Sequence, residues 1–205
     1  YTLDGTTPTA ESQLYTGPIT VNETCQVKAV AMNKGVEKDV LTIDIPMHKA
    51  LGKTVTYSRR PHPRYAAGLP NSLVDGVRGP QIFKSQERGA WNGDPVSLTI
   101  DMEQTEPDSS VTVGMISDKP SYVFFPEKIS VAVSEDGENF CEVAVVVNGV
   151  DNDTDPDELK DYVLSFPETS ARYIKVTIEP VKNIPDWHYA AGRRTYVFID
   201  ELIVR

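Results

Sequence analysis

Short runs that alternate apolar and polar residues recur along this chain, and this period of two predicts β-strands rather than helices. Residues 24–32 alternate in this way, the sequence Asn33-Lys34-Gly35 is typical of a turn, and the alternation returns over residues 38–45. Strand, glycine-containing turn and strand together predict a β-hairpin. No segment has a long helical period, so we expect an all-β protein.

A larger group of strands is predicted after residue 51. The predicted strands span residues 96–102, 111–116, 129–133, 142–147, 161–166, 172–178 and 196–204. About eight short strands in one unit are typical of a β-sandwich or jelly roll. The segments 56–91 and 183–194 lack periodicity. Long irregular segments on a rigid β scaffold are where binding sites are usually found.

The pattern divides the chain into a unit at residues 1–46, a linker at 47–51 and a unit at 52–205. Pro46 ends the first unit. About 45 residues are few for an independent hydrophobic core, so we expect this unit to pack on a neighbour or to lack its first strands. The chain begins at Tyr1 inside a strand-like run, and we expect it to be a fragment of a longer protein.

The charge balance is acidic. Lys and Arg number 20, Asp and Glu number 30, and the formal net charge is −10. A negative surface repels phosphate backbones and anionic membrane surfaces, so we expect no nucleic-acid partner. No apolar run approaches the ~20 residues that span a bilayer, so we expect no membrane insertion. Cys25 and Cys141 are too far apart to form a CxxC metal pair.

The sequence offers no pair of residues suited to catalysis. A glycosidase needs two carboxylates that face each other across a bond. The neighbouring acidic residues 157–158 fall in a loop, and residues 200–201 fall on a strand, where successive side chains point to opposite faces. The sequence has no nucleophile elbow, phosphate loop or dinucleotide motif. We therefore predict no catalytic residue in residues 1–205.

Aromatic, Arg and His residues gather in the irregular segments of the larger unit. A sugar presents an apolar C–H face and a ring of hydroxyls, which suit an aromatic plate beside Arg or His donors. We therefore predict a carbohydrate-binding site there. The candidate residues are Arg59, His62, Trp91, Tyr122, Trp187, His188 and Tyr189.

The alternative for these aromatic side chains is that they close the ends of the sandwich. We expect this structural role for Phe124, Phe125 and Tyr196. For Trp91 and Trp187 both interpretations stay open.

A calcium site is predicted from two distant segments. Asp75-Gly76 is typical of a tight turn whose carbonyl oxygens converge, and Glu201 on the last strand adds a carboxylate. The alternative is a plain turn and a strand carboxylate bonded to the backbone. The acidic run 151–155 is followed by Pro156 where a calcium-binding EF-hand loop needs Gly, so we expect a solvated loop there.

Residues 1–46 resemble a known family. The sequences YTLDGTTPT at 1–9, YTGPI at 15–19 and VKAVA at 27–31 are similar to the chitobiase/β-hexosaminidase C-terminal domain. That family is a small Ig-like β-sandwich attached behind a hydrolase barrel. It has further strand sequence ahead of YTLDG, so the resemblance implies that the sandwich is truncated at its N-terminus in this chain.

Residues 52–205 resemble the discoidin-like family, known also as the coagulation factor V/VIII C-type domain and as carbohydrate-binding module family 32. The similar sequences are SLVDG at 72–76, WNG at 91–93, LTIDM at 98–102, VSEDGENF at 133–140, ARYIKV at 171–176 and FIDELIV at 198–204. The resemblance implies a β-sandwich jelly roll that binds carbohydrate. It also implies calcium at Asp75 and Glu201, but VRG at 77–79 stands where calcium-binding members carry Asn or Asp.

The two units together resemble the C-terminal region of bacterial, Bacteroides-type family 20 glycoside hydrolases, the β-N-acetylhexosaminidases. The resemblance implies a secreted, periplasmic or cell-surface parent protein whose catalytic barrel lies outside these residues. It also implies glycans that contain N-acetylhexosamine or galactose. We therefore expect a non-catalytic region that targets a hydrolase to glycans. The alternative is a structural or protein-contact appendage that packs on the catalytic barrel or on a second subunit without binding sugar.

We expect residues 1–205 to leave chromogenic N-acetylglucosaminides intact, because the sequence predicts no facing pair of carboxylates. The measurement is release of the chromophore by the purified chain. Turnover that is abolished by a substitution within these residues would contradict the prediction.

Overall fold

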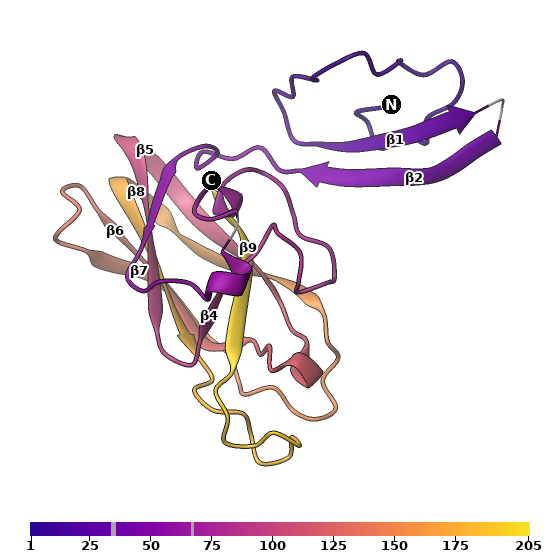
Figure 1. Ribbon diagram of the computed structural model, residues 1–205. Coiled ribbons are helices and arrows are strands. Elements are labelled where there is room, and N and C mark those ends of the chain that lie inside the picture. Colours follow the sequence, from indigo (N-terminus) through magenta and orange to yellow (C-terminus); the bar gives the residue numbers. More distant parts are fainter. Residues whose placement is uncertain (34–35, 67) are drawn as a thin grey trace.

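The computed structural model describes residues 1–33, 36–66 and 68–205, and its strands form two sheets (Figure 1). β1 (Cys25–Asn33) and β2 (Val36–Ile45) form a separate two-stranded sheet. The larger, seven-stranded sheet has the order β4-β9-β5-β8-β6-β7, with β3 paired to β5. Its strands are β3 (Thr54–Tyr57), β4 (Gly89–Asn92), β5 (Val96–Ile116), β6 (Pro126–Ser134), β7 (Cys141–Val147), β8 (Leu159–Pro180) and β9 (Tyr196–Val204). The all-β prediction is confirmed.

Helical structure in the described residues is limited to short turns. Three 3-10 helices occur there, η1 (Pro63–Tyr65), η2 (Asn71–Leu73) and η3 (Lys119–Ser121). None of them has the length or the apolar character needed to cross a membrane.

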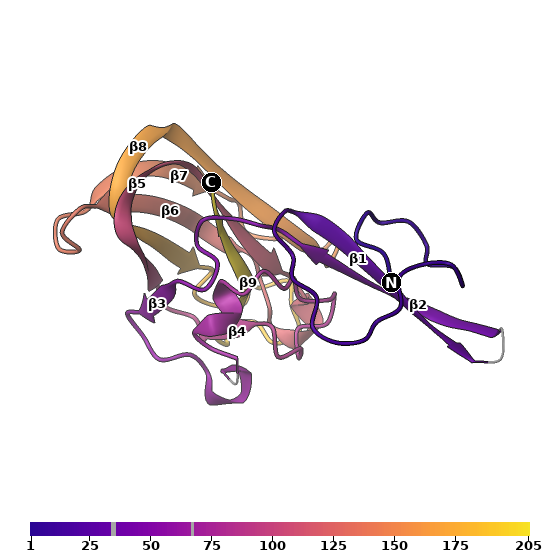
Figure 2. The same ribbon diagram turned by 90° about the horizontal axis from the view of Figure 1, so that it is seen from above.

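Two long strands run through both layers of a β-sandwich. The first part of β5 pairs with the last part of β8, starting with Val96 opposite Ile178. After register shifts, the second part of β5 pairs with the first part of β8, ending with Ile116 opposite Leu159. Such shifts bend a strand, and Figure 2 shows β5 and β8 bending together. The larger sheet therefore folds over on itself.

The bend accounts for a difference from the sequence prediction. The predicted strands 96–102 and 111–116 are parts of β5, and 161–166 and 172–178 are parts of β8. The polar residues between these runs are typical of a loop, but Pro107 still pairs with Ser170 across the corner. β3 and β4 were not predicted, because four residues are too short to show a period.

The main hydrophobic core lies between the two layers. The alternation predicted that Leu98 and Ile100 of β5 face inward, with Val113 on its second part, and all three are fully buried. β3, β6 and β7 extend the layer that holds the first part of β5, and β9 and β4 extend the other layer. Fully buried core residues of the other strands include Val131, Ile174, Val176, Val197, Ile199, Leu202 and Val204.

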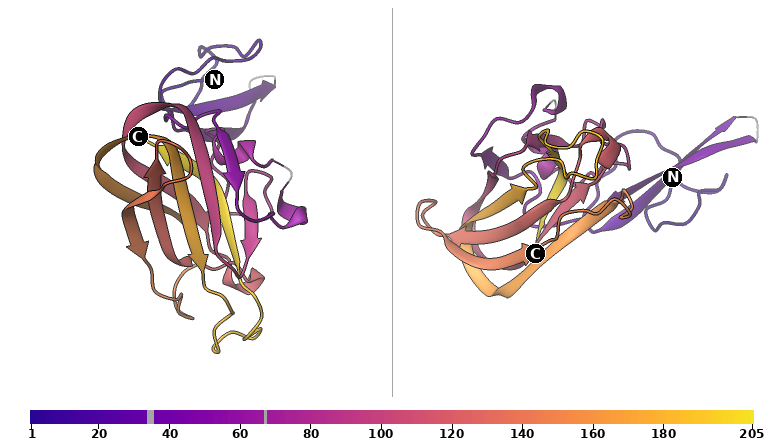
Figure 3. Two further views of the ribbon diagram at one scale, coloured as in Figure 1. Left: turned by 90° about the vertical axis from the view of Figure 1, so that its left-hand side faces the viewer. Right: turned by 90° about the horizontal axis from the view of Figure 1, so that it is seen from below.

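The N-terminal unit, residues 1–46, has little core of its own. Its predicted hairpin pairing is present, beginning with Cys25 opposite Ile45, and Lys34 and Gly35 of the predicted turn lie outside the described residues. None of the described side chains of β1 and β2 is buried. Figure 3 shows this unit at one end of the larger sheet.

The segment 47–51, which joins the N-terminal unit to the larger sheet, is bound rather than free. The Lys49 N–H donates to the Val204 carbonyl at the end of β9 over 3.0 Å. Ala50 is fully buried in the main core. The chain therefore enters the larger sheet through a fixed connection.

A buried ion pair holds the irregular segment before β4 to β9. The Arg88 guanidinium is fully buried and donates to the carbonyl oxygens of Gly79 (2.7 Å) and Pro80 (2.6 Å). It also lies 3.4 Å from the carboxylate of Asp200, which accepts a hydrogen bond from the Gly79 N–H over 3.0 Å. Arg88 thus satisfies several buried acceptors with one side chain.

We expect Arg88→Ala to lower the free energy of unfolding by about 2–4 kcal/mol, because it leaves the Gly79 and Pro80 carbonyls without this donor and Asp200 with Arg78 as its remaining guanidinium partner. The measurement is urea unfolding followed by tryptophan fluorescence. Arg60→Ala is the control, since Arg60 is exposed and its loss should cost less than about 0.5 kcal/mol. Equal stability of the two variants would contradict this account.

Candidate functional site

Three irregular segments leave the larger sheet at one end. β5 ends at Ile116, which pairs with Leu159 at the start of β8 and with Phe198 near the start of β9. The segment after β5 (117–125) and the segments before β8 (148–158) and before β9 (181–195) therefore lie side by side at that end (Figure 1).

The segment between β8 and β9 is a closed loop. Asn183 and Arg194 pair at its neck, and the Ile184 N–H donates to the Arg193 carbonyl over 2.7 Å. Gly192 has φ +81°, a left-handed conformation that glycine adopts without strain, and its N–H donates to the Ile184 carbonyl over 2.9 Å. This loop therefore presents its other side chains in defined positions.

His188 connects this loop to η3. Its Nε2 lies 3.0 Å from the Lys119 carbonyl oxygen, and its Nδ1 accepts a hydrogen bond from the Ala190 N–H over 3.1 Å. A neutral imidazole with its proton on Nε2 satisfies both contacts. His188 is only 8% exposed. The sequence analysis expected His188 to donate a hydrogen bond to a sugar. The structure corrects this expectation, because both ring nitrogens are bonded within the protein.

Trp187 and Tyr189 are exposed on either side of His188 in the sequence. Trp187 is 38% exposed and its ring packs against Phe124, with centroids 6.0 Å apart. Tyr189 is 77% exposed, and its hydroxyl donates to the Pro120 carbonyl over 2.9 Å. The neighbouring Tyr122 hydroxyl raises the pKa of Tyr189, so the phenol stays a donor. Both rings are therefore held from behind and open to solvent.

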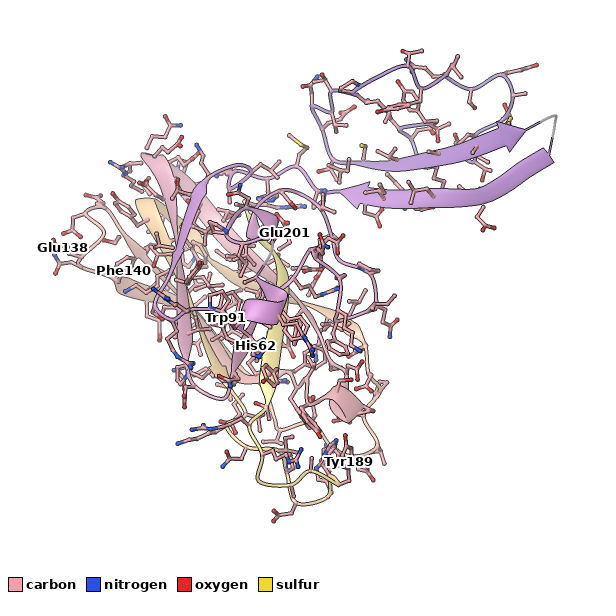
Figure 4. All side chains as sticks on the ribbon, in the orientation of Figure 1. His62, Trp91, Glu138, Phe140, Tyr189 and Glu201 are labelled. Carbon is pink, nitrogen blue, oxygen red and sulfur yellow. The ribbon has the colours of Figure 1, made fainter. Side chains whose placement is uncertain are left out.

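Acidic residues of the segment before β8 face these rings. The Lys119 ammonium donates to the Asp155 carbonyl over 2.6 Å and lies 3.3 Å from the Asp157 carboxylate. Together these segments enclose a pocket of about 300 Å³, which we call the Trp187 pocket. Its lining residues are Lys119, Pro120, Asp153, Asp155, Asp157, Trp187, His188 and Tyr189. Figure 4 shows Tyr189 at this end of the sandwich and Glu201 toward the other end of the sandwich, near the N-terminal unit.

Four of the predicted binding residues come together here. Trp187, His188 and Tyr189 line the pocket, and the Tyr122 ring lies beside Tyr189 with centroids 5.9 Å apart. The Tyr122 hydroxyl accepts a hydrogen bond from Arg193 over 3.3 Å. Tyr122 thus supports the exposed ring of Tyr189.

Trp91 is a core residue. It is 1% exposed, belongs to the main hydrophobic cluster and donates from Nε1 to the Arg59 carbonyl over 3.0 Å. A ring without an exposed face cannot stack on a sugar. The structure therefore removes Trp91 from the candidate site and assigns it the structural role that had been the alternative.

His62 and Arg59 also lie outside the pocket. The Nδ1 of His62 accepts a hydrogen bond from the Arg64 N–H over 3.3 Å, and the imidazole packs on the Tyr196 ring. Arg59 lies 3.6 Å from the carboxylate of Asp94. Figure 4 places His62 beside Trp91 in the body of the sandwich, away from Tyr189. Both side chains therefore serve local structure here.

Most of the larger unit matches one family model. Residues 55–193 match the F5/8 type C domain. The chain belongs to this family. Residues 1–42, ahead of the F5/8 type C domain, match the chitobiase/beta-hexosaminidase C-terminal domain. None of the curated proteins matches the chain.

Solved structures share the fold of the F5/8 type C domain. One is the lectin domain of lectinolysin complexed with Lewis B antigen, at 18% identity over 78% of this chain and 96% of that chain, with a TM-score of 0.52. Another is CBM32-3 from a family 31 glycoside hydrolase of Clostridium perfringens, at 16% identity over 77% of this chain and 92% of that chain, with a TM-score of 0.50. These likenesses confirm the discoidin-like β-sandwich that the sequence predicts.

The predicted calcium ligands of the F5/8 type C domain make other contacts. The Glu201 carboxylate is fully buried, lies 2.9 Å from Nε2 of the equally buried His48 side chain, and accepts a hydrogen bond from the Gly76 N–H over 3.2 Å. Asp75 is exposed, and its carboxylate accepts from the Val77 N–H of its own turn. Burial raises the pKa of Glu201.

These contacts favour the plain-turn alternative over the predicted calcium site. Calcium takes six to eight oxygen ligands, whereas an imidazole nitrogen occupies the position beside Glu201. In the described residues, no group of three or more His, Cys, Asp and Glu side chains is arranged to hold a metal ion. The backbone bonds of Asp75 and Glu201 match the plain-turn alternative, and His48 is the partner that sequence reasoning missed.

Sequence reasoning also missed the acidic wall of the Trp187 pocket. The run 151–155 was expected to be a solvated loop. Asp153 and Asp155 are exposed as expected. Asp151, in contrast, is buried and accepts a hydrogen bond from the Phe125 N–H over 3.2 Å. The position of the run opposite Trp187 depends on the pairing of β5 with β8 and β9. Nothing in the sequence of residues 151–155 themselves indicates that this run lies opposite Trp187.

We expect His48→Ala to lower the free energy of unfolding by about 3–5 kcal/mol, because it leaves the buried Glu201 carboxylate without its partner. A calcium chelator should leave the melting temperature of the wild type unchanged. Asp75→Ala is the control and should have little effect, since Asp75 is exposed. A melting temperature that the chelator lowers and added calcium restores would contradict this account.

Proposed function

We propose that this chain is a non-catalytic, carbohydrate-binding accessory region and that its F5/8 type C domain holds glycans at the Trp187 pocket. The observation that carries the proposal is the pair of exposed rings, Trp187 and Tyr189, beside a pocket of about 300 Å³. A sugar stacks its apolar C–H face on an aromatic ring while its hydroxyls bond to neighbouring acceptors. The carboxylates of Asp153, Asp155 and Asp157 are such acceptors.

Binding at this pocket should be weak. The contact area is small, and each sugar hydroxyl exchanges a hydrogen bond with water for one with the protein, for a net gain of ~1 kcal/mol. Dissociation constants between micromolar and millimolar follow, or roughly 4 to 8 kcal/mol in total. Such affinities suit a module that keeps an enzyme close to an insoluble or multivalent glycan.

The similar structures support a carbohydrate ligand. The lectinolysin lectin domain was solved in complex with Lewis B antigen, and the Clostridium perfringens module belongs to a glycoside hydrolase. We include glycans that contain N-acetylhexosamine or galactose among the proposed ligands.

The parent protein of this chain is, in this proposal, a secreted bacterial β-N-acetylhexosaminidase of the family 20 type. The match of residues 1–42 to the chitobiase/beta-hexosaminidase C-terminal domain supports it. The catalytic barrel belongs to the parent, which acts in the periplasm, at the cell surface or outside the cell. Binding at the Trp187 pocket would raise the concentration of glycan near that barrel.

A protein contact is a second candidate function, and it concerns the N-terminal unit. Leu14, Tyr15 and Leu41 are 80%, 63% and 58% exposed. No described side chain of β1 or β2 is buried. Apolar side chains in this state favour a surface that packs against the catalytic barrel or a second subunit.

The test of the sugar site is Trp187→Ala. A glycan array first identifies ligands of the wild-type chain, and calorimetric titration then compares the variant with the wild type. We expect the variant to lose at least about tenfold in affinity, because it removes an exposed stacking ring worth roughly 1–2 kcal/mol. Its melting temperature should change little, since Trp187 is partly exposed.

Tyr15→Ala is the matched control, because it removes an exposed aromatic ring of the N-terminal unit. It should bind every ligand as the wild type does. A Trp187→Ala variant that binds normally but melts much earlier would move Trp187 into a structural role. In that case the protein-contact function would be the better account of the chain.

A further inference from the structure

The Trp187 pocket carries a net negative charge. Three carboxylates line it, those of Asp153, Asp155 and Asp157, and the single cation in its lining is Lys119.

The positive charge of Lys119 is not presented to a ligand in the pocket. Its ammonium is nearly buried, donates to the Asp155 carbonyl and pairs with the Asp157 carboxylate at 3.3 Å. The Asp155 carboxylate accepts a hydrogen bond from the Asn152 N–H over 2.6 Å. Within the described residues the Asp153 carboxylate has no recorded partner, and it is exposed to the pocket.

The other charges at this end do not reverse the balance. Arg193 bonds to the Tyr122 hydroxyl and does not belong to the pocket lining. Asp118 accepts from the Ser121 N–H in the turn of η3. Asp186, exposed beside Trp187 in the sequence, adds a further negative charge near the loop.

We propose that the Trp187 pocket selects hexosamine sugars whose amine is free and protonated, with Asp153 as the specificity-determining carboxylate. This inference rests on the carbohydrate-binding function proposed above. The ring of such a sugar stacks on Trp187 or Tyr189 as any sugar does, and its ammonium donates to the free carboxylate. An N-acetylated sugar presents a neutral amide instead, and an anionic sugar is repelled.

An oligosaccharide is a better probe than a single sugar. Asp155 also lines an adjoining pocket of about 340 Å³, whose other charged lining residues are Asp151, Glu158 and one cation, Lys160. The acidic surface thus continues past one ring-sized site, and a chain of amino sugars can place a second ammonium along it.

The experiment compares two probes by calorimetric titration at about pH 6, where the amine is protonated. The probes are a glucosamine trisaccharide and its fully N-acetylated counterpart. We expect the wild type to bind the glucosamine trisaccharide about tenfold more tightly at low salt, from one charge pair near the surface. The advantage should fall when the salt concentration rises from about 0.05 M to about 0.5 M.

Asp153→Asn should reduce the preference for the glucosamine trisaccharide over the N-acetylated one to about twofold or less. It should leave binding of the N-acetylated probe unchanged. Asp39→Asn is the matched control, because it makes the same charge change at an exposed position of β2. Asp39→Asn should keep the full advantage. If it also loses the advantage, the attraction comes from the overall charge and the inference is wrong.

The remaining outcomes separate this inference from the proposed function. Equal or tighter binding of the N-acetylated probe, lost in Trp187→Ala, would overturn the amine selectivity and keep the sugar site. Binding of the glucosamine probe that Trp187→Ala leaves unchanged would place the contact elsewhere and overturn both. Failure of the wild type to bind either probe would overturn the amine selectivity, and the glycan array would then decide the sugar site.

Discussion

The pairing of β5 with β8 in both layers of the sandwich is the constraint on which the other features depend. Both strands pass through both layers, and at the corner residues 106–108 of β5 still pair with residues 169–171 of β8 between two register shifts. The same pairing ends at Ile116 and Leu159, and β9 joins it there. The strand ends that meet at this point carry the three segments of the Trp187 pocket, so the site follows from the register of the sheet.

The alternation of apolar residues was sufficient to predict the buried faces of this sheet. Leu98, Ile100 and Val113 lie in the core because a period of two leaves one face of each strand apolar. The corner was not predictable in this way. Its residues are polar and rich in turn formers, and only long-range pairing shows that they continue a strand.

The site could be predicted only in part, because the type of a residue does not show whether its side chain is buried. Trp91 and Trp187 are both tryptophans in segments that lack periodicity in the sequence. The pairing of β4 with β9 nevertheless places Trp91 in the core, whereas Trp187 is partly exposed. Both ring nitrogens of His188 are bonded within the protein, and Nε2 of His48 pairs with Glu201. Among the described residues that line the pocket, Trp187 and Tyr189 keep exposed ring surface. The acidic run 151–155 was visible in the sequence, but its position opposite these rings was not.

The bound connection at residues 47–51 has a consequence for the proposed binding of glycans. Lys49 and Ala50 are fixed to the sheet near the end of β9, and the Trp187 pocket lies at the other end of the sandwich (Figure 4). In the proposed function, the domain would therefore be a rigid spacer rather than a flexible linker. A flexible linker lets the groups it joins sample many distances and directions, whereas a rigid spacer would keep a bound glycan at one distance and in one direction. Any enzyme joined ahead of the N-terminal unit would meet the glycan at a distance set by the length of the sandwich.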